Sequence, residues 1–200
     1  MTLKIPKVPV NRPGSDEIIW VDIYTKLFMD RIIFLSGVIE MKIADQMIGL
    51  LLFLGVDDDD IYIYINSTGG KAPAGISIYN TIQTRIPDVC TSAIGFTAST
   101  ASLILAGGTR YRRKAFPNAR IMIHQPVIGR LYEPPRMLHA EAGRMYYSRN
   151  KVAEIYSQNT GKPINIIQDD MERDRYMSAA EAKDYGIIDH IVEKRKKENL

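Results

Sequence analysis

The sequence contains a single cysteine, little net charge and no long apolar run. Cys90 is the only cysteine among 200 residues, so the chain cannot form an internal disulfide and its fold does not depend on an oxidising compartment. Cys90 lies in an apolar run, which predicts a buried and unreactive thiol. No stretch approaches the roughly 18 apolar residues that a membrane span requires. The most apolar run, 47–54, is too short.

The formal net charge is +3, and part of it comes from the basic run at residues 194–197. A nucleic-acid-binding protein more often carries a basic stripe on a folded element with aromatic residues interleaved. We therefore interpret 194–200 as a solvated basic tail and expect no nucleic-acid partner. The first residues lack a signal-peptide core and a transit-peptide pattern, so we expect the chain to be made in its own compartment or to be processed already.

The remaining pattern predicts alternating strands and helices within one domain over residues 1–200. The clearest strand is 61–65, which is dense in β-branched and aromatic residues and is expected to lead into a turn at 66–70. We expect the first segment, 1–18, to be extended and mobile, because it contains Pro6, Pro9, Pro13 and Gly14. Other strands are expected at 31–35, 88–96, 111–115, 119–124 and 187–192, and helices at 20–28, 44–52, 73–85, from 99, at 135–160 and at 178–186. This order predicts an α/β domain with parallel strands.

Ser99 lies where the strand 88–96 ends and a short helix of small residues begins. A helix N-terminus presents free N–H groups and a partial positive charge, which suit an oxyanion. A serine at this position would serve equally well as a helix cap. The local sequence alone leaves both roles open.

His124 is the best placed of the three histidines to act as a base. It directly follows a predicted buried strand, and Pro126 interrupts the chain soon after it. His139 and His190 are interpreted as surface residues. A lone histidine is more often structural, so this assignment needs support from other residues.

Gly69 and Gly70 follow the strongest strand and add a third feature. Paired glycines let the backbone approach a ligand and expose N–H donors, although a tight turn would explain them as well. Because three separate strand ends each carry a group that acyl transfer needs, we favour one catalytic site.

The carboxylate of such a site is not determined by spacing. Asp169, Asp170 and Asp174 lie together, and any of them could orient an imidazole. The chain order Ser, His, Asp differs from that of the α/β-hydrolases, chymotrypsin and subtilisin, which argues against those families.

Four blocks of the sequence resemble the signature blocks of the Clp protease proteolytic subunit. They cover residues 63–70, 95–101, 121–126 and 172–178, and the resemblance runs from about 6 to 192. The opening Pro6-Lys7-Val8-Pro9, together with 20–24, resembles the plastid-encoded type in particular.

The resemblance implies specific roles at the site. Ser99 matches the family nucleophile, His124 its base and Asp174 the acid that orients the base. Gly70 and Thr100 match the positions whose N–H groups form the oxyanion hole. No metal or organic cofactor is expected. ATP would be used by the partner unfoldase, because this chain has no Gly-x-x-x-x-Gly-Lys loop.

The resemblance also implies an architecture and partners. The fold would be a crotonase-like ββα superhelix with a protruding handle helix at 135–160 and an axial segment at 1–18. Arg173 would link two stacked heptameric rings of homologous ClpP- and ClpR-type subunits, and Tyr62 and Tyr64 would line the docking pocket of an AAA+ Clp unfoldase. The implied location is the chloroplast stroma, or the cytoplasm in a bacterium.

The chain departs from the family pattern at a few positions. Thr68 replaces a proline, Thr100-Ala101 replaces Met-Gly, and 127–135 replaces a glycine-rich strand that aligns the substrate. The leading hypothesis is a serine endopeptidase that hydrolyses unfolded polypeptides inside a double-ring chamber. One alternative is a structural ring subunit with a poorly active triad. The other is a crotonase-type acyl-CoA enzyme, which shares the fold but needs no such triad.

Overall fold

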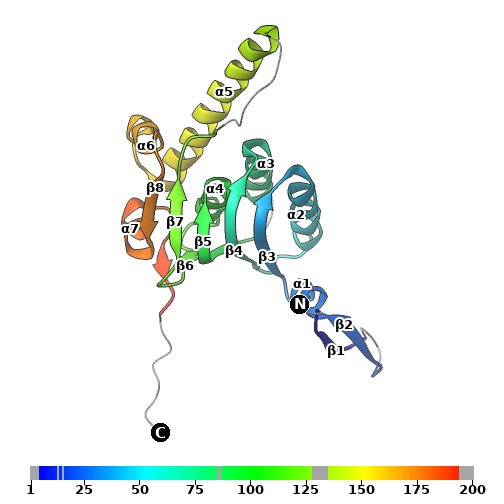
Figure 1. Ribbon diagram of the computed structural model, residues 1–200. Helices are drawn as coiled ribbons and strands as arrows, with labels where there is room; N and C mark the ends of the chain where they lie inside the picture. The colour runs from blue at the N-terminus through cyan, green and yellow to red at the C-terminus, as the bar shows by residue number, and fades with distance from the viewer. Residues whose placement is uncertain (1–4, 13, 15, 85–86, 128–134, 194–200) are drawn as a thin grey trace.

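The computed structural model describes residues 5–12, 14, 16–84, 87–127 and 135–193 and has a central sheet covered by helices (Figure 1). Its strands are β1 (Lys7–Asn11), β2 (Ile18–Asp22), β3 (Ile32–Ile39), β4 (Ile61–Gly70), β5 (Val89–Ala98), β6 (Arg113–Ala115), β7 (Arg120–Ile123), β8 (Arg175–Ser178) and β9 (His190–Ile191). Its helices are α1 (Ile23–Met29), α2 (Met41–Leu54), α3 (Ala72–Ile82), α4 (Thr100–Ala106), α5 (Pro135–Thr160), α6 (Ile164–Asp170) and α7 (Ala179–Tyr185).

The main sheet runs in the order β3–β4–β5–β6–β9, and each neighbouring pair is parallel. Strand β5 pairs twice, with β6 along Thr91–Ala93 and with β7 along Phe96–Ala98. The prediction of an α/β domain with parallel strands is therefore confirmed. Strand β8, which pairs antiparallel with β7, and helix α6 were not predicted.

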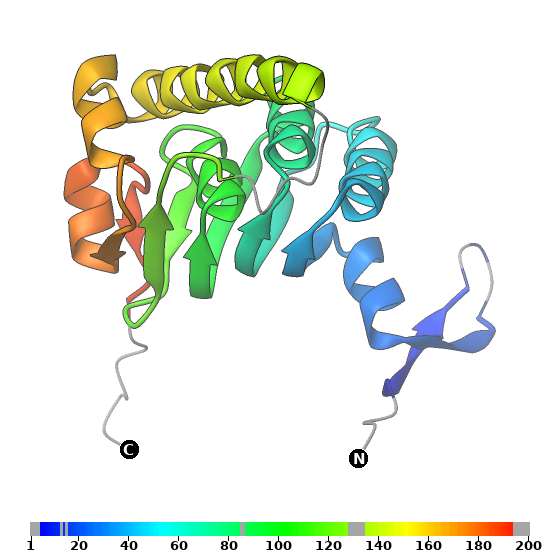
Figure 2. The same ribbon diagram turned by 45° about the horizontal axis from the view of Figure 1, so that its top comes forward.

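Helices α2, α3 and α4 lie side by side along one face of the sheet (Figures 1 and 2). Helix α5 has 26 residues and covers the range where the sequence predicts a long helix. It crosses over the carboxyl ends of the strands near α3 and α4, and its N-terminal half projects beyond them (Figures 1 and 2). Among the described residues, no helix combines the length and apolar character needed to cross a bilayer.

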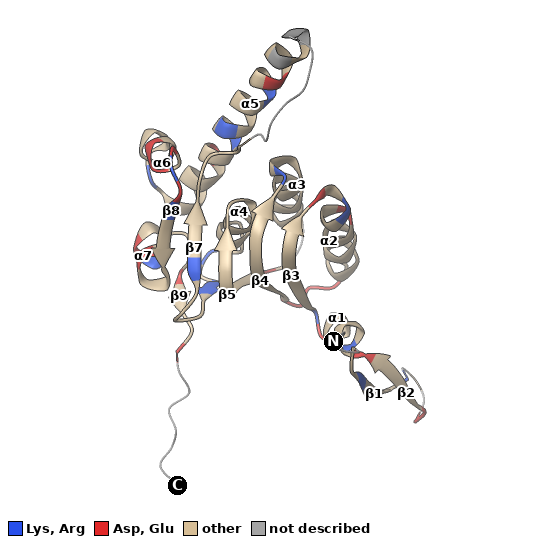
Figure 3. Ribbon diagram, in the orientation of Figure 1, with Lys and Arg blue, Asp and Glu red and all other residues tan. Residues whose placement is uncertain are grey.

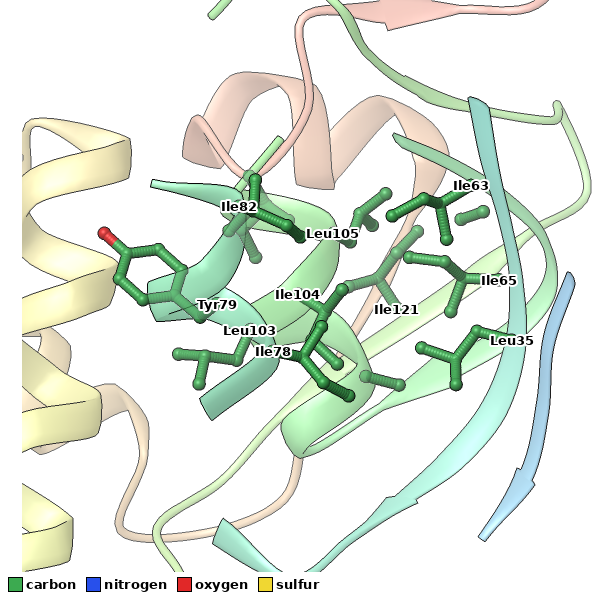
Figure 4. Packing of buried hydrophobic residues seen from close by; sticks show 14 of the residues in the cluster. Leu35, Ile63, Ile65, Ile78, Tyr79, Ile82, Leu103, Ile104, Leu105 and Ile121 are labelled. Atoms are coloured by element: carbon green, nitrogen blue, oxygen red, sulfur yellow. The ribbon is translucent and has the colours of Figure 1, made fainter. Parts of the chain in front are cut away.

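The core lies between the central strands and these helices. Strands β3, β4 and β5 contain no charged residue, so the middle of the sheet is uncharged (Figure 3). Along β4, Ile61, Ile63 and Ile65 are fully buried in the hydrophobic core, and Ile63 and Ile65 lie near residues of α3 and α4 (Figure 4). Burying each such side chain contributes about 1.5–3 kcal/mol. Cys90 is buried as predicted, and burial raises the pKa of its thiol.

The N-terminal region differs from the prediction in where its helix begins. The sequence predicts a helix from about Trp20, but Trp20 lies on β2, which pairs antiparallel with β1. The run 18–21 is β-branched and aromatic, and Asp22 then caps α1 by accepting a hydrogen bond from the Thr25 backbone N–H at 3.0 Å. The predicted segment 1–18 lies partly outside the described residues, and the predicted tail 194–200 lies wholly outside them.

One buried ion pair joins the C-terminal strand to the main sheet. Arg113 donates to both carboxylate oxygens of Asp189, at 2.6 Å and 2.9 Å, and its side chain is only 6% exposed. Burial raises the pKa of the Asp189 carboxyl, but hydrogen bonds from Arg113 outweigh this and hold the pKa below its usual range. The pair therefore contributes stability above the unfolded pKa and loses it as the pH falls through the folded pKa.

We predict that Asp189→Asn lowers the free energy of unfolding at pH 7 by about 3 kcal/mol, because Arg113 is left buried without its charge partner. The difference from wild type should shrink as the pH falls below the unfolded pKa and through the lowered folded pKa of Asp189, because the wild-type carboxyl then loses its charge as well. Urea denaturation at fixed subunit concentration measures both effects. Asp184→Asn, which changes an exposed carboxyl, is the control; equal losses in the two variants would contradict the prediction.

Candidate active site

Ser99 directly follows β5 and adopts an unusual backbone conformation. Its φ is +57° and its ψ is −126°, which a residue with a side chain rarely adopts and which costs on the order of 1–3 kcal/mol. Its backbone N–H donates to the carbonyl oxygen of Met122 on β7 at 2.9 Å. The backbone of Ser99 is thus strained at the turn between β5 and α4, and the hydrogen bond to Met122 holds it in that conformation.

The side chain of Ser99 makes no capping hydrogen bond to α4. Its hydroxyl instead lies 2.9 Å from Nε2 of His124, so the role as a helix cap is wrong. His124 follows β7, whose parallel pairing sets Ala98 opposite Met122. The register of two strands therefore brings the serine and the histidine together.

Asp174 supplies the third group. Its Oδ1 lies 3.0 Å from Nδ1 of His124. The antiparallel register of β7 and β8 pairs Ile123 with Arg175, so the residues just beyond that pair, His124 and Asp174, become neighbours. The sequence alone left three carboxylates open, and Asp174 is the one that contacts the imidazole.

The other two carboxylates point elsewhere. Asp170 accepts from the Tyr185 hydroxyl at 2.7 Å and pairs with Arg175. Asp169 is exposed. His139 and His190 are also exposed, as predicted, which leaves His124 as the only histidine at this site.

The two glycines at the end of β4 lie against two different backbone segments: Gly69 against the turn at Ser99, and Gly70 against β3. The predicted turn at 66–70 is instead the last part of β4, which pairs with β3 as far as Gly70. Gly69 has φ +87°, and a Cβ there would lie 2.7 Å from the Ser99 Cβ and 3.0 Å from the Thr100 nitrogen. A Cβ on Gly70 would meet the backbone of Ile39 at 2.2 Å. Glycine is therefore sterically required at both positions.

A cavity of about 1340 Å³ opens at these groups. It is bounded by the ends of β3 and β4, the start of α3 and the inner side of α5. Its lining includes the serine, the histidine, both glycines and the residue after the serine: Ser99, His124, Gly69, Gly70 and Thr100. Among the described residues, no group of three or more side chains is arranged to hold a metal ion.

Two further hydroxyl groups next to the serine were not identified from the sequence as site residues. Ser102 Oγ lies 2.7 Å from the Ser99 carbonyl oxygen, and Tyr156 Oη lies 2.8 Å from Ser102 Oγ. In the sequence, Ser102 is only one of the small residues near the start of the short helix after Ser99. Tyr156 is 57 positions from Ser99 and on another helix, so no local pattern indicates the contact.

Three predicted site residues lie away from this centre. Tyr62 and Tyr64 alternate with buried isoleucines on β4 and so face the other side of the sheet. Tyr64 stacks on Phe34 with ring centroids 5.5 Å apart, and Phe34 meets Tyr24 at 6.5 Å, so the surface is wider than the sequence indicated. Arg173, beside Asp174, is exposed.

A serine, a histidine and an aspartate joined in this order by hydrogen bonds are the arrangement of the serine hydrolases. Comparison with known proteins identifies the group more closely. Residues 14–195 match the Clp protease family. The chain is 43% identical to an ATP-dependent Clp protease proteolytic subunit of Adiantum capillus-veneris over 96% of this chain and 97% of the relative. Subunits of the same name from Lotus japonicus and Chaetosphaeridium globosum are 44% and 45% identical, over 96% of this chain and 99% and 96% of theirs.

The chain therefore belongs to the Clp protease family. It is a proteolytic subunit of that protease, a serine endopeptidase, and its relatives include plastid-encoded subunits. The family works as an oligomer with an ATPase partner. The resemblance drawn from the sequence blocks is thus confirmed, and the match argues against the alternative of an acyl-CoA enzyme.

We predict that Gly69→Ala lowers the labelling rate of Ser99 by a fluorophosphonate about a hundredfold, because displacing a reacting group by an ångström can cost that much. Gly161→Ala is the matched control. Gly161 also has a positive φ, +75°, but a Cβ there would meet nothing within 4 Å. Both variants should lose some stability, and only the first should lose reactivity. Equal labelling rates would show that the close approach of Gly69 does not position the serine.

Proposed function

We propose that Ser99, His124 and Asp174 form the catalytic triad of this subunit. The observation that carries the proposal is the continuous chain of hydrogen bonds from the Ser99 hydroxyl through both nitrogens of His124 to Asp174, at 2.9 Å and 3.0 Å. A base must lie within hydrogen-bond reach of the proton that it removes, and this geometry satisfies that requirement.

In this mechanism Nε2 of His124 accepts the Ser99 proton while the serine oxygen attacks the carbonyl carbon of a peptide bond. Asp174 accepts a hydrogen bond from Nδ1–H, which keeps Nε2 free as an acceptor and stabilises the imidazolium that forms. The imidazolium then donates its proton to the leaving amine. Water, deprotonated by the same imidazole, hydrolyses the acyl-enzyme and restores the serine.

The oxyanion of the tetrahedral intermediate is assigned to the backbone N–H groups of Gly70 and Thr100. Both residues line the cavity beside Ser99, and the Gly69 backbone approaches Thr100 closely enough to keep them together. Fixed N–H donors of this kind are worth about 10²–10³ in rate. The cavity borders five elements, β3, β4, α3, α4 and α5, which suits an extended, unfolded polypeptide better than a folded protein.

The assembly is proposed to be two stacked heptameric rings of homologous ClpP- and ClpR-type subunits with a crotonase-like ββα superhelix in each subunit. Helix α5 supports this because its projecting half leaves Tyr146 and Tyr147 69% exposed, as expected of a handle that packs against another subunit. Arg173 is exposed next to Asp174, as expected of a residue that links the two rings. The proposed location is the chloroplast stroma. The altered segment 127–135 lies mostly outside the described residues.

Docking of the AAA+ unfoldase is proposed at the aromatic surface of Tyr62 and Tyr64, extended by Phe34 and Tyr24. These side chains lie on the sheet face opposite the buried isoleucines of β4. Exposed aromatic groups that are already held by stacking lose little entropy on binding a partner. ATP would be hydrolysed by that partner.

We predict that Ser99→Ala abolishes both fluorophosphonate labelling and peptide hydrolysis in the assembled protein. Asp174→Asn should lower the hydrolysis rate about 10⁴-fold, because the imidazole loses its orienting charge. Asp169→Asn, an isosteric change of an exposed neighbour, should leave the rate unchanged. An assembled wild type without an adduct on Ser99 would favour the structural ring subunit, and acyl-CoA turnover that survives Ser99→Ala would favour the crotonase-type enzyme.

We also predict that Tyr64→Ala lowers unfoldase-dependent degradation of a protein substrate roughly tenfold, the effect typical of a binding hot spot. Hydrolysis of a short peptide, which needs no unfoldase, should not change. Tyr64→Phe keeps the ring that stacks on Phe34 and is the control; it should degrade protein substrates normally. Loss of short-peptide hydrolysis in Tyr64→Ala would contradict a role confined to docking.

A further inference from the structure

Two buried hydroxyl groups contact the backbone of the proposed nucleophile. Ser102 Oγ lies 2.7 Å from the carbonyl oxygen of Ser99 and 2.7 Å from that of Met122. Tyr156 Oη lies 2.8 Å from Ser102 Oγ and 3.3 Å from the Ser99 carbonyl oxygen. Ser102 is completely buried and Tyr156 is 1% exposed, so water does not compete for these groups.

The two hydroxyl protons add to backbone hydrogen bonds at two carbonyl oxygens. The Ser99 carbonyl already accepts from the backbone N–H groups of Ser102 and Leu103 at 3.0 Å and 3.2 Å, and the Met122 carbonyl accepts from the Ser99 N–H. Each hydroxyl has one proton to donate, and the acceptors within reach are the Ser99 and Met122 carbonyls and the partner hydroxyl. If Ser102 donates to Met122, Tyr156 is the only hydroxyl left to donate to the Ser99 carbonyl or to Ser102. If Tyr156 is removed, Ser102 must choose between the two carbonyls. The hydroxyls therefore act as one unit.

This unit joins the backbone of the nucleophile to the strand that carries the base. Ser99 has the strained φ of +57°, and the direction of its carbonyl oxygen defines the ψ angle that accompanies it. Met122 precedes His124 by two residues on β7 and also accepts the Ser99 N–H. A contact that holds both carbonyls thus limits relative movement of the serine and the histidine.

We propose that Ser102 and Tyr156 are positioning residues for the peptidase reaction: they hold the Ser99 backbone in the conformation that directs its hydroxyl at His124, and they attach it to helix α5. This inference rests on the proposed role of Ser99 as nucleophile. Neither side chain contacts the reacting atoms, so their effect is on the geometry of the serine.

Protonation of Tyr156 does not vary over the working range of a protease. Burial raises the pKa of its hydroxyl far above the ordinary value, so the group remains a donor at every pH at which the enzyme works. Removing it should lower activity by the same factor at each pH and leave the midpoint of the pH profile where it is in wild type.

The test uses Tyr156→Phe, Ser102→Ala and the double variant in the assembled full-length chain. Each single change should lower kcat for a short peptide and the rate of fluorophosphonate labelling about tenfold, with KM unchanged; this is less than the hundredfold that an ångström of displacement can cost. Because the two hydroxyls form one unit, their effects should not add: kcat and the labelling rate of the double variant should be about the same as those of either single variant.

Tyr79→Phe is the matched control. It also removes the hydroxyl of a buried tyrosine that is bonded to α5. The Tyr79 hydroxyl accepts from Asn159 Nδ2 at 3.2 Å and points toward α5 (Figure 4). It should lower the melting temperature as much as Tyr156→Phe does and leave kcat unchanged.

The possible outcomes separate the two proposals. Equal labelling rates for Tyr156→Phe and Tyr79→Phe, or a rise in KM without a fall in kcat, would overturn the positioning role while the triad stands. A shift in the pH midpoint would also overturn it. Wild-type protein that does not label on Ser99 would overturn the triad and this inference together.

Discussion

The hydrogen bond from the Ser99 N–H to the Met122 carbonyl is the contact on which the geometry of the site depends. It ties the end of β5 to β7, and β7 is followed at once by His124. The opposite edge of β7 pairs with β8, which places Asp174 beside the same histidine. The three groups are thus spaced by backbone pairing within one sheet, and long flexible side chains are not needed to bring them together.

The same region shows how a strained residue is retained. The conformation of Ser99 costs free energy, and it persists only because the surroundings leave no alternative. Gly69 lies so close to Ser99 that a Cβ on Gly69 would not fit. Gly75 of α3 lies equally close to Thr100, because a Cβ on Gly75 would be 2.7 Å from the Thr100 Cβ. Stability lost at one residue is offset by a large uncharged core in the adjoining strands.

The sequence predicts the parts of the site that have a local signature. Strand ends, a serine at a strand-to-helix boundary and a histidine after a buried strand are all visible in short windows. Asp174 is different: the neighbouring strand β8 has four residues, of which only one is buried, and gives no periodic signal. Only the family resemblance therefore selected the carboxylate that contacts His124. The hairpin of β1 and β2 was missed because Trp20 fits a helical stripe as well as it fits a strand, and the capping role of Asp22 decides between them.

Helix α5 both lines the cavity and supports the backbone of Ser99. Val152 lines the cavity, and Tyr156, one turn later on the same helix, contacts the backbone of Ser99 through its hydroxyl. Because these residues lie on one rigid helix, a displacement of α5 changes the width of the cavity and the support of the serine together. The opposite face of the sheet, with Tyr62 and Tyr64, shares none of these contacts, since the buried isoleucines of β4 separate the two surfaces. A partner bound there can therefore leave the hydrolytic geometry intact, whereas a partner that moves α5 cannot.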